Sequence, residues 1–243
     1  RQSPPLFGAA YEPAIKATRE EAPSISRAAD VWSELLRRYV ATLSEAERNV
    51  LVIALYCPWL FELHEQRMLP YLPAPPPLQA HPLAHHLSLR SFRGTLAVAD
   101  ELGYLRYHPT LAVGCDAANA SGDDMTPEPG CWIGDFLLFL RDDEGPYCVN
   151  LTVKSSRAEF GEPSVHLTPR TNMARARARE VARHEVEAKL YADIGIPTIQ
   201  VAADELNPII VANLRQVLLW QRRSHGLDES QQDLALEALH VGL

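Results

Sequence analysis

A hairpin signal in the second half of the chain constrains the fold more than any other feature. Two apolar runs of strand length, residues 135–140 and 147–154, flank a turn rich in Asp, Gly and Pro at 142–146. Apolar runs around such a turn are typical of two antiparallel strands. The first run opens with Asp135 and the second ends with Lys154, so the pattern predicts a carboxylate and an ammonium at one end of a β-hairpin. Metal-assisted phosphodiester cleavage requires a metal ligand and a cation placed in this way.

Length and charge narrow the classes of protein to which the chain can belong. Its 243 residues, 47% of them hydrophobic, can bury the core of one large domain or two small ones. A net charge of −8 argues against tight binding of nucleic acid by charge alone. The four cysteines show no CxxC spacing, which favours free thiols in a reducing compartment. No apolar run reaches the roughly 18 residues that span a bilayer, so we expect a soluble intracellular protein without a membrane partner.

Composition and hydrophobic periodicity predict one folded domain between two less regular ends. We expect residues 1–28 to form a flexible N-terminal arm and residues 29–218 to form the folded domain. Residues 219–243 are expected to form a short helical tail. The expected helices cover residues 30–42, 45–56, 93–102, 172–194 and 208–223. Outside the hairpin we expect strands at 61–69 and 197–202, the latter buried, and loops at 70–85 and 108–130. This order predicts an α/β fold with helices flanking a mixed β-sheet.

A capping box supplies a second candidate carboxylate. Ser44 and Glu47 have the spacing of a helix N-cap and its third helical residue, and capping alone explains both. The alternative is that Glu47 joins Asp135 on a hard cation such as Mg²⁺, which prefers oxygen ligands.

Three arginines of the expected 172–194 helix share one face. They are Arg175, Arg179 and Arg183, spaced four residues apart. Glu180 and Glu187 could balance them on a charged outer face. The other interpretation is a stripe that contacts DNA phosphates.

Several short motifs occur in the order found in one family. They are Ala46-Glu47-Arg48, His64-Glu65-Gln66, Asp135-Phe136-Leu137, Thr152-Val153-Lys154, Glu185-Val186-Glu187, Gly195-Ile196-Pro197 and Glu205-Leu206-Asn207-Pro208. On these motifs the chain resembles the TnsA-type transposon-end endonucleases of the restriction-endonuclease-like PD-(D/E)xK superfamily. The resemblance covers residues 40–218 and implies a restriction-endonuclease-like mixed β-sheet flanked by helices, with a short helical C-terminal extension.

The resemblance also implies a set of site residues. Glu47, Asp135 and Lys154 become the catalytic triad, and Mg²⁺, for which Mn²⁺ can substitute, becomes the cofactor. Glu47, Asp135 and the backbone carbonyl of Val153 would hold the metal. Thr152 replaces the Gln or Glu of the family and would contribute a weak contact by its hydroxyl.

The function implied is that of a metal-dependent DNA endonuclease subunit of a heteromeric transposase. It would cleave the 5′ strands at transposon ends in cut-and-paste transposition, while a DDE-type transposase subunit cuts the 3′ strands. An AAA+ transposition regulator is a further implied partner, although the family's regulator-binding helical domain is reduced here to the tail after Ser224. The implied location is the bacterial cytoplasm, on the nucleoid when assembled.

Two alternatives stay open at the level of sequence. A standalone PD-(D/E)xK nuclease in repair or restriction would cut DNA without a partner. A nuclease-fold assembly module would have lost catalysis, and the Thr152 replacement keeps this alternative open.

Overall fold

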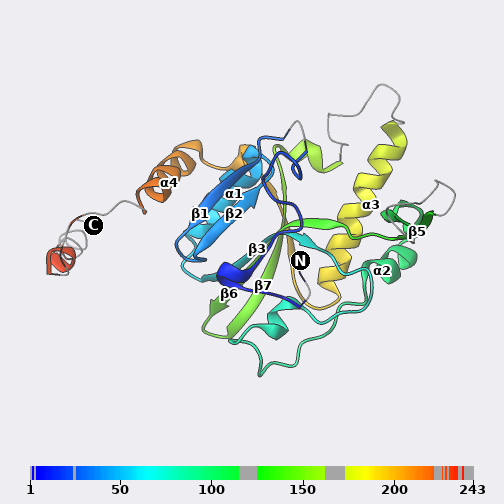
Figure 1. Cartoon of the computed structure of the whole chain (residues 1–243), viewed down its shortest axis with the longest axis horizontal. Helices are drawn as coiled ribbons and strands as arrows, with labels where there is room; N and C mark the ends of the chain where they lie inside the picture. The colour runs from blue at the N-terminus through cyan, green and yellow to red at the C-terminus, as the bar shows by residue number, and fades with distance from the viewer. Residues whose placement is uncertain are drawn as a thin grey trace.

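A mixed four-stranded sheet forms the centre of the protein (Figure 1). The computed structural model describes residues 2, 4–23, 26–114, 125–161 and 173–221, together with 226, 228, 230–234 and 237 of the tail. The strand order is β3 (Leu60–Met68), β6 (Ile133–Asp142), β7 (Gly145–Lys154) and β8 (Thr198–Ala202). β7 pairs antiparallel with β6 and parallel with β8. The predicted α/β class, a mixed sheet flanked by helices with a short C-terminal helix, is therefore confirmed.

Strand alternation directs the side chains of the sheet into two separate cores. Successive residues of a strand point to opposite faces, so Phe136 and Leu138 lie on one face and Leu137 and Phe139 on the other. The first face packs against α1 (Glu45–Leu55) and the second against α3 (Met173–Ala192). Figure 1 shows these two helices on opposite sides of the sheet.

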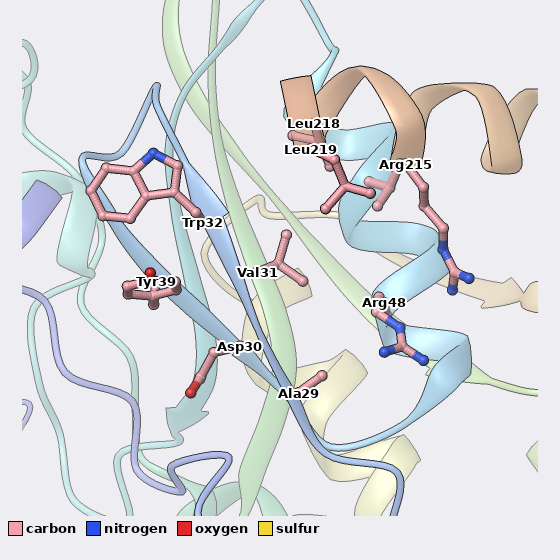
Figure 2. Close-up of a pocket in the computed structure, with 10 residues that line it drawn as sticks. Ala29, Asp30, Val31, Trp32, Tyr39, Arg48, Arg215, Leu218 and Leu219 are labelled. Atoms are coloured by element: carbon pink, nitrogen blue, oxygen red, sulfur yellow. The ribbon is translucent and has the colours of Figure 1, made fainter. Parts of the chain in front are cut away.

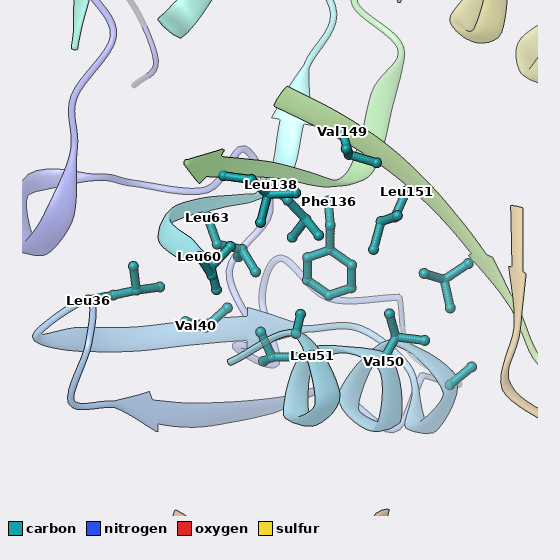
Figure 3. Packing of buried hydrophobic residues seen from close by; sticks show 14 residues of the cluster. Leu36, Val40, Val50, Leu51, Leu60, Leu63, Phe136, Leu138, Val149 and Leu151 are labelled. Atoms are coloured by element: carbon teal, nitrogen blue, oxygen red, sulfur yellow. The ribbon is translucent and has the colours of Figure 1, made fainter. Parts of the chain in front are cut away.

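A cluster of buried hydrophobic side chains forms the core beneath α1. Figure 3 shows Val50 and Leu51 of α1 facing Phe136 and Leu151 of the sheet, all at most 7% exposed. Fully burying a side chain of this size stabilises a fold by about 1.5–3 kcal/mol. This packing fixes α1, and with it the N-terminal turn of the helix, against the end of the β6–β7 hairpin.

The helix expected over residues 30–42 is wrong, because this segment is a β-hairpin. β1 (Ala29–Ser33) pairs antiparallel with β2 (Arg38–Thr42). Arg37 has φ 55°, a left-handed backbone that belongs to a turn and interrupts a helix. Trp32 and Tyr39 form a cross-strand aromatic pair, which stabilises sheet rather than helix.

The other helices agree with the sequence predictions to within a few residues. α1 and α3 lie within their expected ranges, and α2 (Thr95–Glu101) lies within the expected 93–102. α4 (Pro208–Trp220) begins after Asn207, whose side chain accepts hydrogen bonds from two backbone N–H groups of the first turn. Proline at the first helical position and an Asn cap are favourable N-terminal signals.

Two other loop and strand predictions need correction. β4 (Thr110–Gly114) and β5 (Met125–Pro129) form a hairpin within the expected 108–130 loop, whose residues 115–124 lie outside the described part. The 197–202 strand was expected to be buried, yet β8 is an edge strand in which Ile199 is 49% exposed. The remaining described elements are 3₁₀ turns at Gly8–Ala10, Pro77–Ala80, Leu105–Tyr107, Arg157–Gly161 and Ala203–Glu205.

The N-terminal segment lies against β3, where the sequence predicts a flexible arm. Gly8 N–H donates to the Glu62 carboxylate at 2.5 Å, and Tyr11 Oη–H donates to the Glu65 carbonyl at 2.6 Å. Ala14 N–H donates to the Gln66 carbonyl at 3.0 Å. At the other end, residues 230–234 of the tail are helical. No helix in the described ranges is long and apolar enough to cross a membrane.

Candidate active site

The β6–β7 hairpin brings Asp135 and Lys154 to the same end, as the sequence predicts. Phe136 pairs with Leu151, so Asp135 lies level with the last residues of β7. The backbone N–H of Val153 donates to Asp135 Oδ2 at 2.7 Å. Lys154 ends β7, and its side chain is 16% exposed. The pair is therefore partly buried at one end of the two central strands.

Glu47 is held rigidly at the N-terminus of α1. Ser44 caps the helix by accepting a hydrogen bond from the Glu47 N–H at 3.1 Å, so the N-cap half of the predicted capping box is present. Glu47 Oε1 accepts from Ser44 Oγ at 3.0 Å, and Oε2 accepts from the Leu43 N–H at 2.8 Å. Glu47 is only 8% exposed, which is unusual for a residue that serves as a cap alone.

Gln66 of β3 lies opposite Asp135 in the sheet and is hydrogen-bonded to Glu47. The neighbours of Gln66, Glu65 and Arg67, pair with Phe136 and Gly134, which leaves Gln66 opposite Asp135. Its Nε2 donates to Glu47 Oε2 at 3.0 Å. Gln66 has φ 45°, a left-handed conformation that costs a non-glycine residue roughly 1–2 kcal/mol. Strain of this kind concentrates at functional sites.

The two carboxylates are within electrostatic reach of each other. Burial, and next the negative charge of Asp135, raise the pKa of Glu47 to about 7. Arg183 of α3 lies 3.5 Å from Asp135 Oδ1 and donates to the Ile133 carbonyl at 3.3 Å. Its guanidinium partly offsets the repulsion between Asp135 and Glu47.

The arginine stripe of α3 is divided by the fold. Arg175 and Arg179 are exposed, whereas the side chain of Arg183 is 21% exposed and faces Asp135. Glu180 faces Lys154, and Glu187 is completely buried. The interpretation of Glu180 and Glu187 as counter-charges on an outer face is therefore wrong, because both carboxylates point toward the sheet.

Glu187 is a fully buried carboxylate of α3 beside Gly134 and Asn150. Asn150 of β7 donates to Glu187 Oε1 at 3.1 Å, while Oε2 has no hydrogen-bond partner among the described residues. Burial raises the pKa of Glu187 to about 7. A Cβ on Gly134 would lie 2.7 Å from Glu187 Oε1, so the glycine makes room for this carboxylate beside Asp135.

The donor set suits a magnesium ion bound through few protein ligands. In the described part of the chain, no three His, Cys, Asp or Glu side chains are grouped as a metal site. Mg²⁺ commonly takes one or two carboxylates and completes its octahedron with water and substrate phosphate. Glu47 Oε1 accepts one hydrogen bond and keeps a lone pair, and Asp135 Oδ1 lies 3.5 Å from the Arg183 guanidinium. Two carboxylate oxygens whose negative charges repel each other suit such an ion, because its positive charge would offset the repulsion.

Thr152, for which a weak metal contact is expected, is buried within the sheet. It is 2% exposed and lies level with Gln200 of β8. Strand alternation puts Thr152 and Lys154 on the same face of β7 and Val153 on the other, where Val153 packs in the core beneath α1. The side chain of Val153 thus anchors the strand, while its backbone N–H donates to Asp135.

Sequence reasoning missed two residues that orient the site. Glu180 was assigned to an outer face, although its position three residues before Arg183 places both on neighbouring parts of one helix surface. Gln66 was noticed only within a short motif, because a left-handed backbone leaves no signal in a strand pattern that reads as regular.

A separate apolar groove lies between the β1–β2 hairpin and α4 (Figure 2). Val31, Trp32 and Tyr39 line one side, and Leu218 and Leu219 line the other. Its lining residues include neither the candidate carboxylates nor a histidine, so we place the candidate chemistry at the hairpin end of the sheet. Comparison of the chain with protein-family models finds no match, and comparison with curated proteins finds none either.

Proposed function

We propose that this protein is a metal-dependent DNA endonuclease that acts as a subunit of a heteromeric transposase and cleaves the 5′ strands at transposon ends. The observation that supports the proposal best is the influence of the Asp135 charge on Glu47, with Lys154 at the same end of the hairpin as Asp135. The two carboxylates come from different elements, and burial together with the charge of Asp135 raises the pKa of Glu47 to about 7. An ammonium lies at the same end of the hairpin.

Each residue has a role that its surroundings suit. Glu47 and Asp135, with the Val153 carbonyl, would hold Mg²⁺ or Mn²⁺, which supplies a nucleophilic water and stabilises charge on the phosphate. Lys154 would orient the water or stabilise the transition state. The hydrogen bonds to Glu47 and Asp135 fix both carboxylates before substrate arrives, which lowers the cost of organising the site.

The charge of the protein supports dependence on a partner for DNA binding. At a net charge of −8, few phosphates can be neutralised by the chain itself. Arg175 and Arg179 on the exposed side of α3 would contact DNA locally, and Arg183 would act within the site. A DDE-type transposase, with an AAA+ regulator, would deliver the transposon end. Assembly would take place on DNA in the bacterial cytoplasm.

Two other functions use the same fold. A standalone repair or restriction nuclease would cut efficiently without a transposase, which the acidic charge disfavours. An inactive assembly module would not need the buried, strained arrangement of Gln66 and Glu47.

A strand-resolved cleavage assay tests the proposal. Labelled transposon-end DNA is incubated with the protein, its cognate DDE-type transposase and Mg²⁺ or Mn²⁺. We expect the Asp135→Asn and Lys154→Met variants to lose the 5′-strand cut and to keep the 3′-strand cut. The matched control is Lys189→Met, because Lys189 pairs with Asp193 at the far end of α3.

The outcomes separate the three functions. Cutting by the protein alone at the rate of the complete mixture would support the standalone nuclease. Absence of a 5′ cut in the wild type, together with absence of Mn²⁺ binding by calorimetry, would support the inactive module. Wild-type cutting by both active-site variants would overturn the assignment of the site.

A further inference from the structure

Glu180 of α3 contacts three cationic or titratable side chains at once. Glu180 Oε1 lies 2.6 Å from Lys154 Nζ, 3.1 Å from His184 Nε2 and 3.5 Å from Arg183 Nη1. Two of these partners, Arg183 and His184, come from α3 itself, one turn farther along. Lys154 comes from the end of β7, so this contact joins the helix to the sheet across the site.

The environment of Glu180 keeps it charged. Burial raises the pKa of Glu180, but His184, Arg183 and Lys154 outweigh it and lower the pKa far below its usual range. The side chain is 21% exposed, and that of Lys154 is 16% exposed, so water screens the pair less than at an open surface. A charge-assisted hydrogen bond of 2.6 Å in such a setting restricts the rotamers of the long lysine side chain.

Arg183 extends the same network to the candidate metal ligands. It lies 3.5 Å from Asp135 Oδ1 and 3.5 Å from Glu180 Oε1. Negative and positive groups therefore alternate from Asp135 through Arg183 and Glu180 to Lys154. In this series of contacts, Glu180 is the group that fixes the distance between Arg183 of α3 and Lys154 of β7.

We infer that Glu180 is a positioning residue. It holds the Lys154 ammonium at the end of β7 in the orientation in which Lys154 assists the attack of water on the phosphodiester. The inference rests on the proposed function for its consequence in catalysis. Its structural part, the restraint of Lys154 by Glu180, stands on the contacts alone. Glu180 itself touches neither the metal nor the substrate in this scheme.

The test compares the wild type with Glu180→Gln in two measurements. In the first, single-turnover and steady-state cleavage in the complete transposase mixture give kcat and the KM for DNA. We expect kcat to fall by about 10²-fold with an unchanged KM, because a misplaced catalytic group slows the reaction without weakening substrate binding. In the second, trace acetic anhydride labels lysines, and mass spectrometry compares Lys154 with Lys189. We expect Lys154 to be acetylated several-fold faster in the variant.

Glu185→Gln is the matched control. Glu185 is an exposed glutamate of the same helix that accepts a hydrogen bond from Tyr104 Oη, away from Lys154. We expect wild-type behaviour in both measurements. If Glu180→Gln does not fold, Glu180→Asp, which keeps the charge on a shorter side chain, replaces it with the same expected split.

The two proposals fail in different ways. A wild type that cuts no DNA overturns the proposed function, while the acetylation comparison still decides the restraint of Lys154. Wild-type acetylation of Lys154 in Glu180→Gln overturns the positioning role, whatever happens to kcat. A parallel loss of DNA affinity and kcat, without faster acetylation, also overturns it, because general damage to the site would produce that result.

Discussion

Gln66 donates a hydrogen bond to Glu47 over 3.0 Å from a left-handed backbone position within β3. The bond joins the sheet to the first turn of α1, and Gln66 lies opposite Asp135 in the sheet. The distorted conformation of Gln66 is therefore tied directly to the orientation of a candidate metal ligand. Substitutions of Gln66 can measure separately the cost of its left-handed backbone conformation and the benefit of its hydrogen bond to Glu47.

We predict that Gln66→Gly is more stable than Gln66→Ala by about 1 kcal/mol, since glycine adopts positive φ without the steric penalty. Both variants lose the hydrogen bond to Glu47, so both should bind Mn²⁺ more weakly than the wild type. Urea unfolding and calorimetric titration with Mn²⁺ measure the two effects. Equal stability of the two variants would show that φ at this position carries no strain.

Ser44→Ala should lower the free energy of unfolding by about 1 kcal/mol, which is the usual cost of losing a helix N-cap. Ser44 also donates to Glu47 Oε1, so the variant should reduce Mn²⁺ affinity as well. Ser44→Asp, which restores a cap without an O–H donor, should recover stability by urea unfolding but not the affinity. Recovery of both properties would limit Ser44 to a structural role.

The raised pKa of Glu187 predicts that the free energy of unfolding falls as pH rises. The pKa of Glu187 is about 7 in the folded protein, because of burial, against an ordinary value of 4.5. Between these values the folded chain keeps a proton that the unfolded chain releases, so stability is lost as pH rises through about 7. Glu187→Gln should remove part of this slope and stabilise the protein at pH 8 by up to about 3 kcal/mol. Urea unfolding at a series of pH values measures the slope, and an unchanged slope would contradict the prediction.

The buried ion pair of Arg38 and Glu65 should contribute strongly to the attachment of the β1–β2 hairpin. The two side chains are 6% and 0% exposed and are joined by hydrogen bonds of 2.7 and 2.8 Å. Arg38→Met should cost about 3–5 kcal/mol, because it leaves a buried carboxylate without its partner.

Replacing both partners of this pair should cost less than the sum of the single changes, which a double-mutant cycle by urea unfolding measures. The exposed pair of Arg157 and Glu205 is the control, and breaking it should leave the unfolding midpoint unchanged. Simple additivity at Arg38 and Glu65 would contradict a coupled pair.

Local signals were sufficient to predict the hairpin and the capping box. The Asp-Gly-Pro turn defines the β6–β7 pair, and the Ser44–Glu47 spacing defines the start of α1, because both depend on residues close in sequence. The proximity of Asp135 and Lys154 followed from the hairpin. That Glu47 joins them in one site was implied only by family resemblance, and it stays a prediction that the influence of the Asp135 charge on Glu47 supports.

The errors arose where tertiary context decides. Val31, Leu35, Leu36 and Tyr39 fit a helical period, yet Leu35 and Tyr39 are half exposed and the segment pairs as a hairpin. The inward direction of Glu180 depends on how α3 is rotated against the sheet. Because α3 carries charged residues on several sides, its sequence does not fix that rotation.

The placement of the site between the two cores has a consequence for how activity arises during folding. The hairpin strands can pair early, since their residues are close in sequence, whereas Glu47 and Glu180 must each reach the hairpin end across long intervening segments. Glu47 arrives with the packing of α1 on one face and Glu180 with that of α3 on the other. A partly folded chain thus has an incomplete set of candidate site residues, and the proposed nuclease activity would be acquired only at the last stage of assembly of the domain.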